Sequence, residues 1–113
     1  MHPPITIAMA SYNGARFIRA QLDSIAQQSV TNWRLVVSDD GSTDETRQIV
    51  AKFARDCASG QVELIEGPRQ GATRNFLYLT RQADLGGWLA YADQDDFWLP
   101  DRLQRGIAFL SGQ

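Results

Sequence analysis

Residues 35–42 read LVVSDDGS, and this stretch decides how the 113-residue chain folds. With Trp33 and Arg34 before it, the apolar run is typical of a buried strand and predicts one over 33–38. The strand then runs into two aspartates, a glycine and a serine, which favour turns and helix starts. Ser42 and Glu45 fit a capping box, so we expect a helix to begin at Ser42.

The same alternation of a short apolar run and a helical pattern recurs along the whole chain. Further strands are expected over 5–10, 62–66 and 88–92. The expected helices cover 15 to about 28, 42 to about 60, a stretch with Phe76, Leu77, Thr80 and Ala83, and a last segment after Pro100 that carries Leu103, Ile107 and Leu110 on one face. This order predicts an α/β fold in one domain, residues 1–113, with a mostly parallel, Rossmann-like sheet and helices on both faces.

Composition narrows the possible functions. Hydrophobic residues make up 43% and charged residues 21% of the chain, and the net charge is −2. This balance gives no general attraction to nucleic acid or to anionic lipid. The single cysteine, Cys57, is spaced like a small core residue and cannot form an internal disulfide. Without a long apolar run or a signal peptide, the chain is expected to be soluble and cytoplasmic.

The polar clusters fall where the predicted strands end. These are Ser11-Tyr12-Asn13, Asp39-Asp40, Gly67 to Gly71 and Asp93 to Asp96. In parallel α/β sheets ligands bind beyond the carboxyl ends of the strands. We therefore expect the acids at positions 40, 93 and 95 to gather around one pocket.

Asp93 and Asp95 can converge on one point, because alternate residues of an extended chain share a face. Two such carboxylates suit Mg²⁺ or Mn²⁺, with phosphate oxygens completing the shell. The alternative is a solvated acidic turn next to the last helix.

Three other features are candidates for binding a nucleotide. A carboxylate of the Asp39-Asp40 pair could accept hydrogen bonds from a base or a sugar, Tyr12 could stack on a base, and Arg69 could bind a diphosphate with its guanidinium. The alternatives are helix capping for the aspartates, turn packing for Tyr12 and an ordinary exposed arginine for Arg69. For Arg74 we expect exposure, and for Trp98 core packing.

Together these residues resemble the family 2 glycosyltransferases of the GT-A fold. The resemblance is carried by ITIAMASYN (5–13), LVVSDDGST (35–43), GATRNF (71–76) and YADQDDFWLPDRL (91–103). The last two motifs are similar to a rhamnosyltransferase-like branch that builds bacterial surface polysaccharides. Such enzymes move a sugar from a nucleotide diphosphate donor to a saccharide or lipid-linked acceptor, and they invert the configuration at its anomeric carbon.

The resemblance also implies roles for single residues. Tyr12 matches a base-contacting position, and Asp40 the carboxylate that binds the pyrimidine of a dTDP- or UDP-linked donor. Asp93 matches the first acid of the Asp-x-Asp motif, near ribose and metal, and Asp95 the ligand of the divalent cation. Ala10 stands where relatives often carry Thr or Ser, so one base contact is expected to be missing.

The resemblance further implies that the general base lies beyond Gln113, because family members are longer. The chain is then expected to be the donor-binding half of the enzyme, inactive alone and prone to self-association, with the whole protein peripheral at the inner face of the membrane. A non-catalytic nucleotide-binding or interaction module is the alternative. A receiver-type signalling domain fits less well, because the only lysine, Lys52, lies within a helical stripe. No G-x-G-x-x-G motif supports a dinucleotide-binding domain.

Overall fold

The computed structural model describes residues 5–83, 88–93 and 98–105, and within them strands and helices alternate as expected. The elements are β1 (Ile5–Ser11), α1 (Ala15–Ala26), β2 (Trp33–Asp39), α2 (Thr46–Asp56), β3 (Val62–Glu66), α3 (Ala72–Ala83) and β4 (Trp88–Asp93). Side chains in 82–83, 88–89 and at 93 lie outside the described part.

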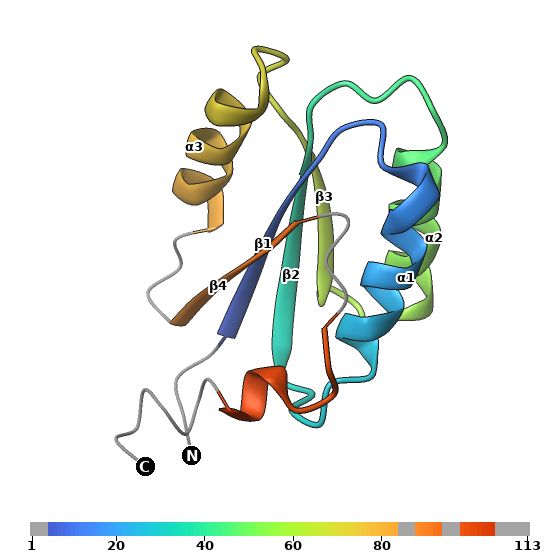
Figure 1. The fold of residues 1–113 in the computed structure, drawn as a ribbon, viewed down its shortest axis with the longest axis vertical. Coiled ribbons are helices and arrows are strands. Elements are labelled where there is room, and N and C mark those ends of the chain that lie inside the picture. The colour runs from blue at the N-terminus through green and yellow to red at the C-terminus, as the bar shows by residue number, and fades with distance from the viewer. Residues whose placement is uncertain (1–4, 84–87, 94–97, 106–113) are drawn as a thin grey trace.

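The described strands form one parallel sheet in the order β3-β2-β1-β4. Helices α1 and α2 lie on one side of this sheet and α3 on the other (Figure 1). The prediction of a parallel sheet with helices on both faces is confirmed. The strand order is that of the Rossmann type, whereas receiver-type domains follow the order 2-1-3-4-5. The receiver alternative is therefore wrong for this chain.

The two central strands, β1 and β2, are buried on both faces, and the larger core lies between the sheet and the helices α1 and α2. Leu35 and Val37 of β2 belong to this core, whereas Val36, between them, packs with Leu79 of α3. Successive residues of a strand point to opposite faces of the sheet, so β2 supplies apolar side chains to both sides. The same alternation separates the two aspartates that follow Ser38.

The capping box predicted from Ser42 and Glu45 is wrong. Helix α2 begins at Thr46, and Glu45, at the N-cap position, makes no side-chain capping bond. The Ser42 hydroxyl instead donates to Asp39 Oδ1 at 2.5 Å and accepts the backbone N–H of Asn13 at 2.8 Å. The Ser42 hydroxyl therefore makes tertiary hydrogen bonds and does not cap the helix as the local sequence predicted.

The third helix is present as predicted, as α3. Helix α3 buries Asn75 and Leu79, while Phe76 and Leu77 are exposed. The Asn75 amide bonds to Ser38 of β2 in the interior. Phe76 contacts Tyr91 of β4, with ring centroids 4.9 Å apart.

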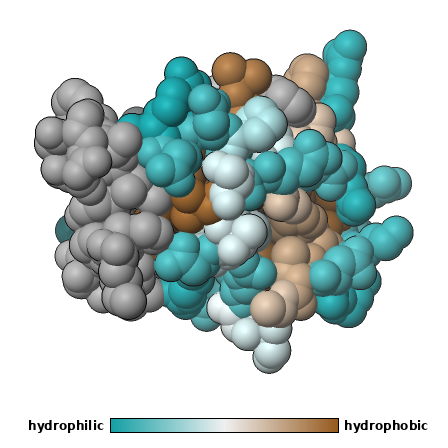
Figure 2. Space-filling view, turned by 90° about the horizontal axis from the view of Figure 1, so that it is seen from below, coloured by the Kyte–Doolittle hydropathy of each residue, from teal (hydrophilic) through white to brown (hydrophobic). Residues whose placement is uncertain are grey.

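The described C-terminal segment, residues 98–105, packs against the end of α1 and the residues that follow it. Residues 102–105 are helical and Leu103 is buried, in agreement with a helix after Pro100, whereas Ile107 and Leu110 lie outside the described residues. Trp98 is buried, as predicted, and its backbone N–H donates to the Ser24 hydroxyl. The lower face of the molecule is mostly hydrophilic where it is described, with apolar areas between the polar side chains (Figure 2). Among the described helices, none has the length and apolarity needed to cross a bilayer.

Candidate functional site

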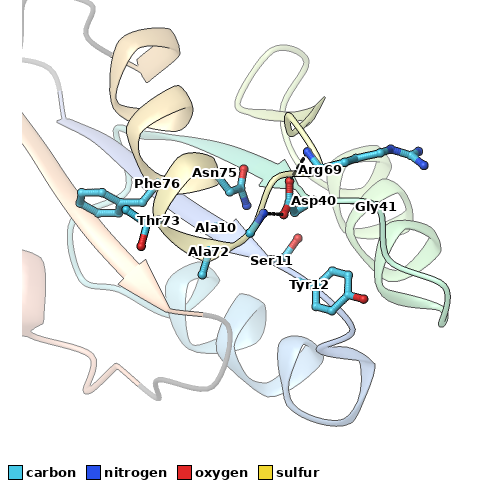
Figure 3. Close-up of a pocket in the computed structure, with 11 residues that line it drawn as sticks. Ala10, Ser11, Tyr12, Asp40, Gly41, Arg69, Ala72, Thr73, Asn75 and Phe76 are labelled. Carbon is cyan, nitrogen blue, oxygen red and sulfur yellow. Dashed lines mark hydrogen bonds between the residues drawn. The ribbon is translucent and has the colours of Figure 1, made fainter.

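A pocket of about 1060 Å³ opens at the carboxyl end of the sheet. It is lined by residues of the β1 and β2 ends, the β3–α3 loop and the first turns of α3: Ala10, Ser11, Tyr12, Asp40, Gly41, Arg69, Gly71, Ala72, Thr73, Asn75 and Phe76 (Figure 3). The predicted site residues Tyr12, Asp40 and Arg69 therefore lie around one pocket, at the edge where parallel α/β sheets bind ligands.

Asp40 is 8% exposed and holds the β3–α3 loop. Its Oδ1 accepts the backbone N–H of Arg69 at 2.6 Å, and its Oδ2 accepts that of Gly71 at 3.2 Å. Arg69 and Gly71 both have positive φ, at 59° and 97°. These conformations turn the loop amides toward the carboxylate. Each carboxylate oxygen keeps a further lone pair, so Asp40 can still accept a hydrogen bond from a ligand in the pocket.

The guanidinium of Arg69 does not stand free in the pocket. It lies 3.4 Å from Glu66 and is exposed, and the side chain extends over Gly41. Among described residues, Arg47 also pairs with Glu66, at 2.6 Å. Arg69 thus contributes its backbone N–H to the site, and its binding to a diphosphate stays a prediction.

Asp39 is fully buried and points to the opposite face from Asp40. It accepts the hydroxyls of Ser11 and Ser42 and the backbone N–H of Ser42, and Arg47 Nε lies 3.6 Å away. This carboxylate joins the ends of β1 and β2 to the loop before α2. Its role is therefore in the fold.

Tyr12 is 55% exposed and stands at the pocket rim opposite α3. The residue after it, Asn13, has a positive φ of 48°, and its side-chain oxygen accepts the backbone N–H of Thr43 at 2.8 Å. The backbone N–H of Gly14 donates to the Thr46 hydroxyl at 2.9 Å. The β1–α1 loop is thus fixed against the β2–α2 loop, which sets the position of Tyr12.

Asp44 joins the starts of two helices, and no motif in the sequence analysis identified it. One carboxylate oxygen accepts the N–H of Ala15 at 3.1 Å, and the other accepts the N–H and the hydroxyl of Thr46. The hydrogen bond from the Thr46 hydroxyl, opposed by desolvation and assisted by the backbone donors, lowers the pKa of Asp44 below its ordinary value.

A second shifted group, Cys57, lies at the other end of α2. Burial raises the pKa of its thiol, with a contribution from the charge of Asp56.

The lowered pKa of Asp44 predicts an acid-sensitive contribution to stability. A carboxyl group with a depressed folded pKa stabilises the fold above its unfolded pKa, about 4, and loses this effect as the pH falls through the folded value. We expect Asp44→Asn to reduce the free energy of unfolding at pH 7 and the difference from the wild type to shrink below about pH 4. Urea unfolding between pH 3 and 7 measures it, with Asp23→Asn, at an exposed helix pair, as control. A difference that is constant over this range would contradict the prediction.

The structure places the backbone of Asp93, but not its side chain, at the predicted site. Asp93 is the last residue of β4, and its Cα pairs with that of Ala10, which lines the pocket. Asp95 lies outside the described residues. Within the part of the chain that is described, no group of three His, Cys, Asp or Glu side chains could hold a metal. The metal prediction for Asp93 and Asp95 therefore stays a prediction.

The chain is similar in sequence to known glycosyltransferases. The sequence matches the family described as Glycosyl transferase family 2 over residues 6–112. It is 34% identical to the dTDP-rhamnosyl transferase RfbG of Shigella flexneri, over 90% of this chain and 36% of the relative. It is 28% identical to the UDP-Glc:alpha-D-GlcNAc-diphosphoundecaprenol beta-1,3-glucosyltransferase WfgD of Escherichia coli, over 94% of this chain and 40% of the relative.

Solved structures agree with this relationship. The mannosyltransferase PcManGT of Pyrobaculum calidifontis, in complex with GDP-Man and Mn²⁺, superposes with a TM-score of 0.87 at 28% identity, over 98% of this chain and 33% of the other. TarS of S. aureus, in complex with UDP-GlcNAc, gives a TM-score of 0.83 at 25% identity, over 96% and 31%. The chain therefore spans about two-fifths or less of its relatives. From its sequence match and its GT-A fold, it belongs to glycosyltransferase family 2.

Proposed function

We propose that this chain carries the donor-binding site of an inverting glycosyltransferase that moves a sugar from a nucleotide diphosphate to a saccharide or lipid-linked acceptor. The observation that carries the proposal is the pocket at the carboxyl end of the sheet, where Asp40 and Tyr12 lie together. The end of β4, with Asp93, pairs with β1 beside this pocket. The family relationship supports the same activity.

In this proposal the nucleoside binds at the Asp40 end of the pocket. The base lies against the ring of Tyr12, and Asp40 accepts its imide N–H. A uracil or thymine base fits this arrangement, because both carry a hydrogen at N3. The relatives include enzymes named for dTDP-rhamnose and for UDP-glucose chemistry, so a dTDP- or UDP-linked donor, with rhamnose as one candidate sugar, is proposed.

We further propose that Asp95 and Asp93 hold a divalent cation, Mg²⁺ or Mn²⁺. Carboxylates are the oxygen donors that these ions prefer, and β4 brings Asp93 to the level of Ala10 in the pocket. A bound cation would neutralise the negative charge that gathers on a diphosphate leaving group. Support for a cation comes from the relative solved with Mn²⁺.

The attack on the sugar needs a group other than those of the pocket. An acceptor hydroxyl approaches the anomeric carbon from the side opposite the diphosphate, which inverts the centre and calls for a general base. Among the described residues that line the pocket, Asp40 is the only carboxylate, and in this proposal it accepts hydrogen bonds from the β3–α3 loop and from the base. We therefore assign donor binding to these residues and the base to a segment outside them.

The proposal is tested by nucleotide binding. Asp95→Asn is expected to weaken UDP or dTDP binding about tenfold or more in the presence of Mn²⁺, and to have little effect in EDTA, because it removes a charged metal ligand. Isothermal titration calorimetry measures both conditions. The control is Asp101→Asn, which removes an exposed carboxylate paired only with Arg105 among the described ion pairs. Unchanged Mn²⁺-dependent binding in Asp95→Asn would refute the metal role.

A sugar-transfer assay separates catalysis from mere binding. The alternative is a non-catalytic nucleotide-binding module. It is supported by the small share of the two relatives' length that this chain spans, 36% of RfbG and 40% of WfgD. The assay compares this chain with a longer protein that includes it. We expect transfer only by the longer protein, whereas full activity of the 113-residue chain would refute the assignment of the base to another segment.

A further inference from the structure

Asn75 is a buried amide whose bonds reach across from α3 to β2. The residue is 2% exposed and lies at the back of the pocket (Figure 3). Its Oδ1 accepts the hydroxyl of Ser38 at 2.5 Å, and its Nδ2 donates to the carbonyl oxygen of Ser38 at 3.0 Å. Only a group with an acceptor and a donor side by side satisfies both partners, and a primary amide is such a group.

Together with backbone hydrogen bonds, these bonds form a closed network that includes Asp40. Ser38 lies two residues before Asp40, so the two side chains share the α3 face of the sheet. On the other side, the N–H of Gly71 donates to Asp40 Oδ2, and the carbonyl of Gly71 accepts the N–H of Asn75 at 3.0 Å. The carboxylate is therefore held between two segments that Asn75 ties together.

Gly67 shows how closely Asn75 and Asp40 are packed. A Cβ atom at position 67 would lie 2.6 Å from Asn75 Oδ1 and 2.9 Å from Asp40 Oδ1. Real Cβ atoms do not approach oxygens so closely, so a side chain at 67 would displace one or both groups. The backbone N–H of Gly67 also donates to the carbonyl of Asp39, at 2.7 Å, which fixes this approach.

We propose that Asn75 is a positioning residue that sets the base specificity of the donor site by holding Asp40 in place. The inference rests on the proposed function, in which Asp40 accepts the N3 hydrogen of uracil or thymine. Cytosine has no hydrogen at N3, and its lone pair there would face the carboxylate. A firmly held Asp40 rejects cytosine, whereas a carboxylate free to turn away tolerates it. Asn75 thus acts on selectivity through Asp40 rather than by binding the base.

The test measures the ratio of CDP to UDP dissociation constants for the 113-residue chain, by NMR titration in the presence of Mn²⁺. The wild type is expected to prefer UDP by tenfold or more. In Asn75→Ala the ratio should fall to within about threefold of one, through weaker UDP binding and tighter CDP binding. Ser38→Ala should give an intermediate ratio, because it removes the hydroxyl bond and leaves the bond from Nδ2 to the carbonyl.

Leu79→Ala is the matched control for a purely structural role. Leu79 is 1% exposed on the same helix and packs against Ala8 and Val36 without a polar contact. Its variant should lower thermal stability and leave the CDP-to-UDP ratio unchanged. If Asn75→Ala fails to fold, Ser38→Ala decides, because an unchanged ratio in that variant would overturn the inference.

The outcomes separate this inference from the proposed function. If Asp40→Ala abolishes the preference for UDP while Asn75→Ala and Ser38→Ala keep it, the positioning role is overturned and the donor site stands. If the wild type binds UDP and CDP equally, base reading by Asp40 is wrong and the inference falls with it. If the wild type binds neither nucleotide, the proposed function itself fails.

Discussion

Replacing Asp40 with asparagine is expected to weaken UDP binding by about 10- to 150-fold, the equivalent of one charge-assisted hydrogen bond of about 1.5–3 kcal/mol. The amide group would present N–H where Asp40 now accepts N–H from the loop and, in our proposal, from the base. The same change should loosen the β3–α3 loop at Arg69 and Gly71. Calorimetric titration with UDP, with and without Mn²⁺, measures the effect.

The loss should be present in both metal conditions, because Asp40 acts on the base and not on the cation. This separates it from Asp95→Asn, whose effect depends on Mn²⁺. Glu63→Gln provides the control, since it removes one exposed carboxylate, paired with Arg34, away from the pocket residues. Wild-type affinity in Asp40→Asn would show that this carboxylate does not read the base.

For Asp39, which precedes Asp40, we expect the largest loss of stability and not a loss of nucleotide binding. Asp39→Asn should lower the free energy of unfolding by about 3 kcal/mol, because a fully buried carboxylate with several donors is replaced by a group that cannot accept from all of them. Oδ1 already accepts both the Ser11 and the Ser42 hydroxyl, so the amide nitrogen would replace Oδ2 and face the backbone N–H of Ser42 and the guanidinium of Arg47. Urea-induced unfolding, followed by circular dichroism, gives the difference.

Asp23→Asn is a suitable comparison for this loss. Asp23 pairs with Arg19 at 3.4 Å on the exposed surface of α1, where such a pair contributes no more than about 0.5 kcal/mol. A loss in Asp39→Asn as small as in Asp23→Asn would mean that the buried network does not stabilise the fold. The two neighbouring aspartates are thus predicted to have different roles: replacing Asp40 weakens nucleotide binding, and replacing Asp39 lowers the stability of the fold.

Local sequence predicted the presence of the strands and helices well, and the ends of the helices less well. The strand over 33–38 was expected from its apolar run, and β2 covers Trp33–Asp39. Ser42 was expected to cap a helix, but a buried carboxylate and the turn at Asn13 use its hydroxyl. A short motif records only what a residue can do with its neighbours in sequence. Partners 29 residues away are decided by the sheet.

Sequence alone determined that strands and helices alternate, that the sheet is parallel, and that Tyr12, Asp40 and the Asp93 end of a strand meet at one edge. Parallel strands bring their carboxyl ends together whatever the details. The tertiary structure decided which of Asp39 and Asp40 faces the pocket. Both faces of β2 are apolar in sequence, with Val36 on one and Leu35 and Val37 on the other, so only the packing of α3 against Val36 fixes the side of each aspartate.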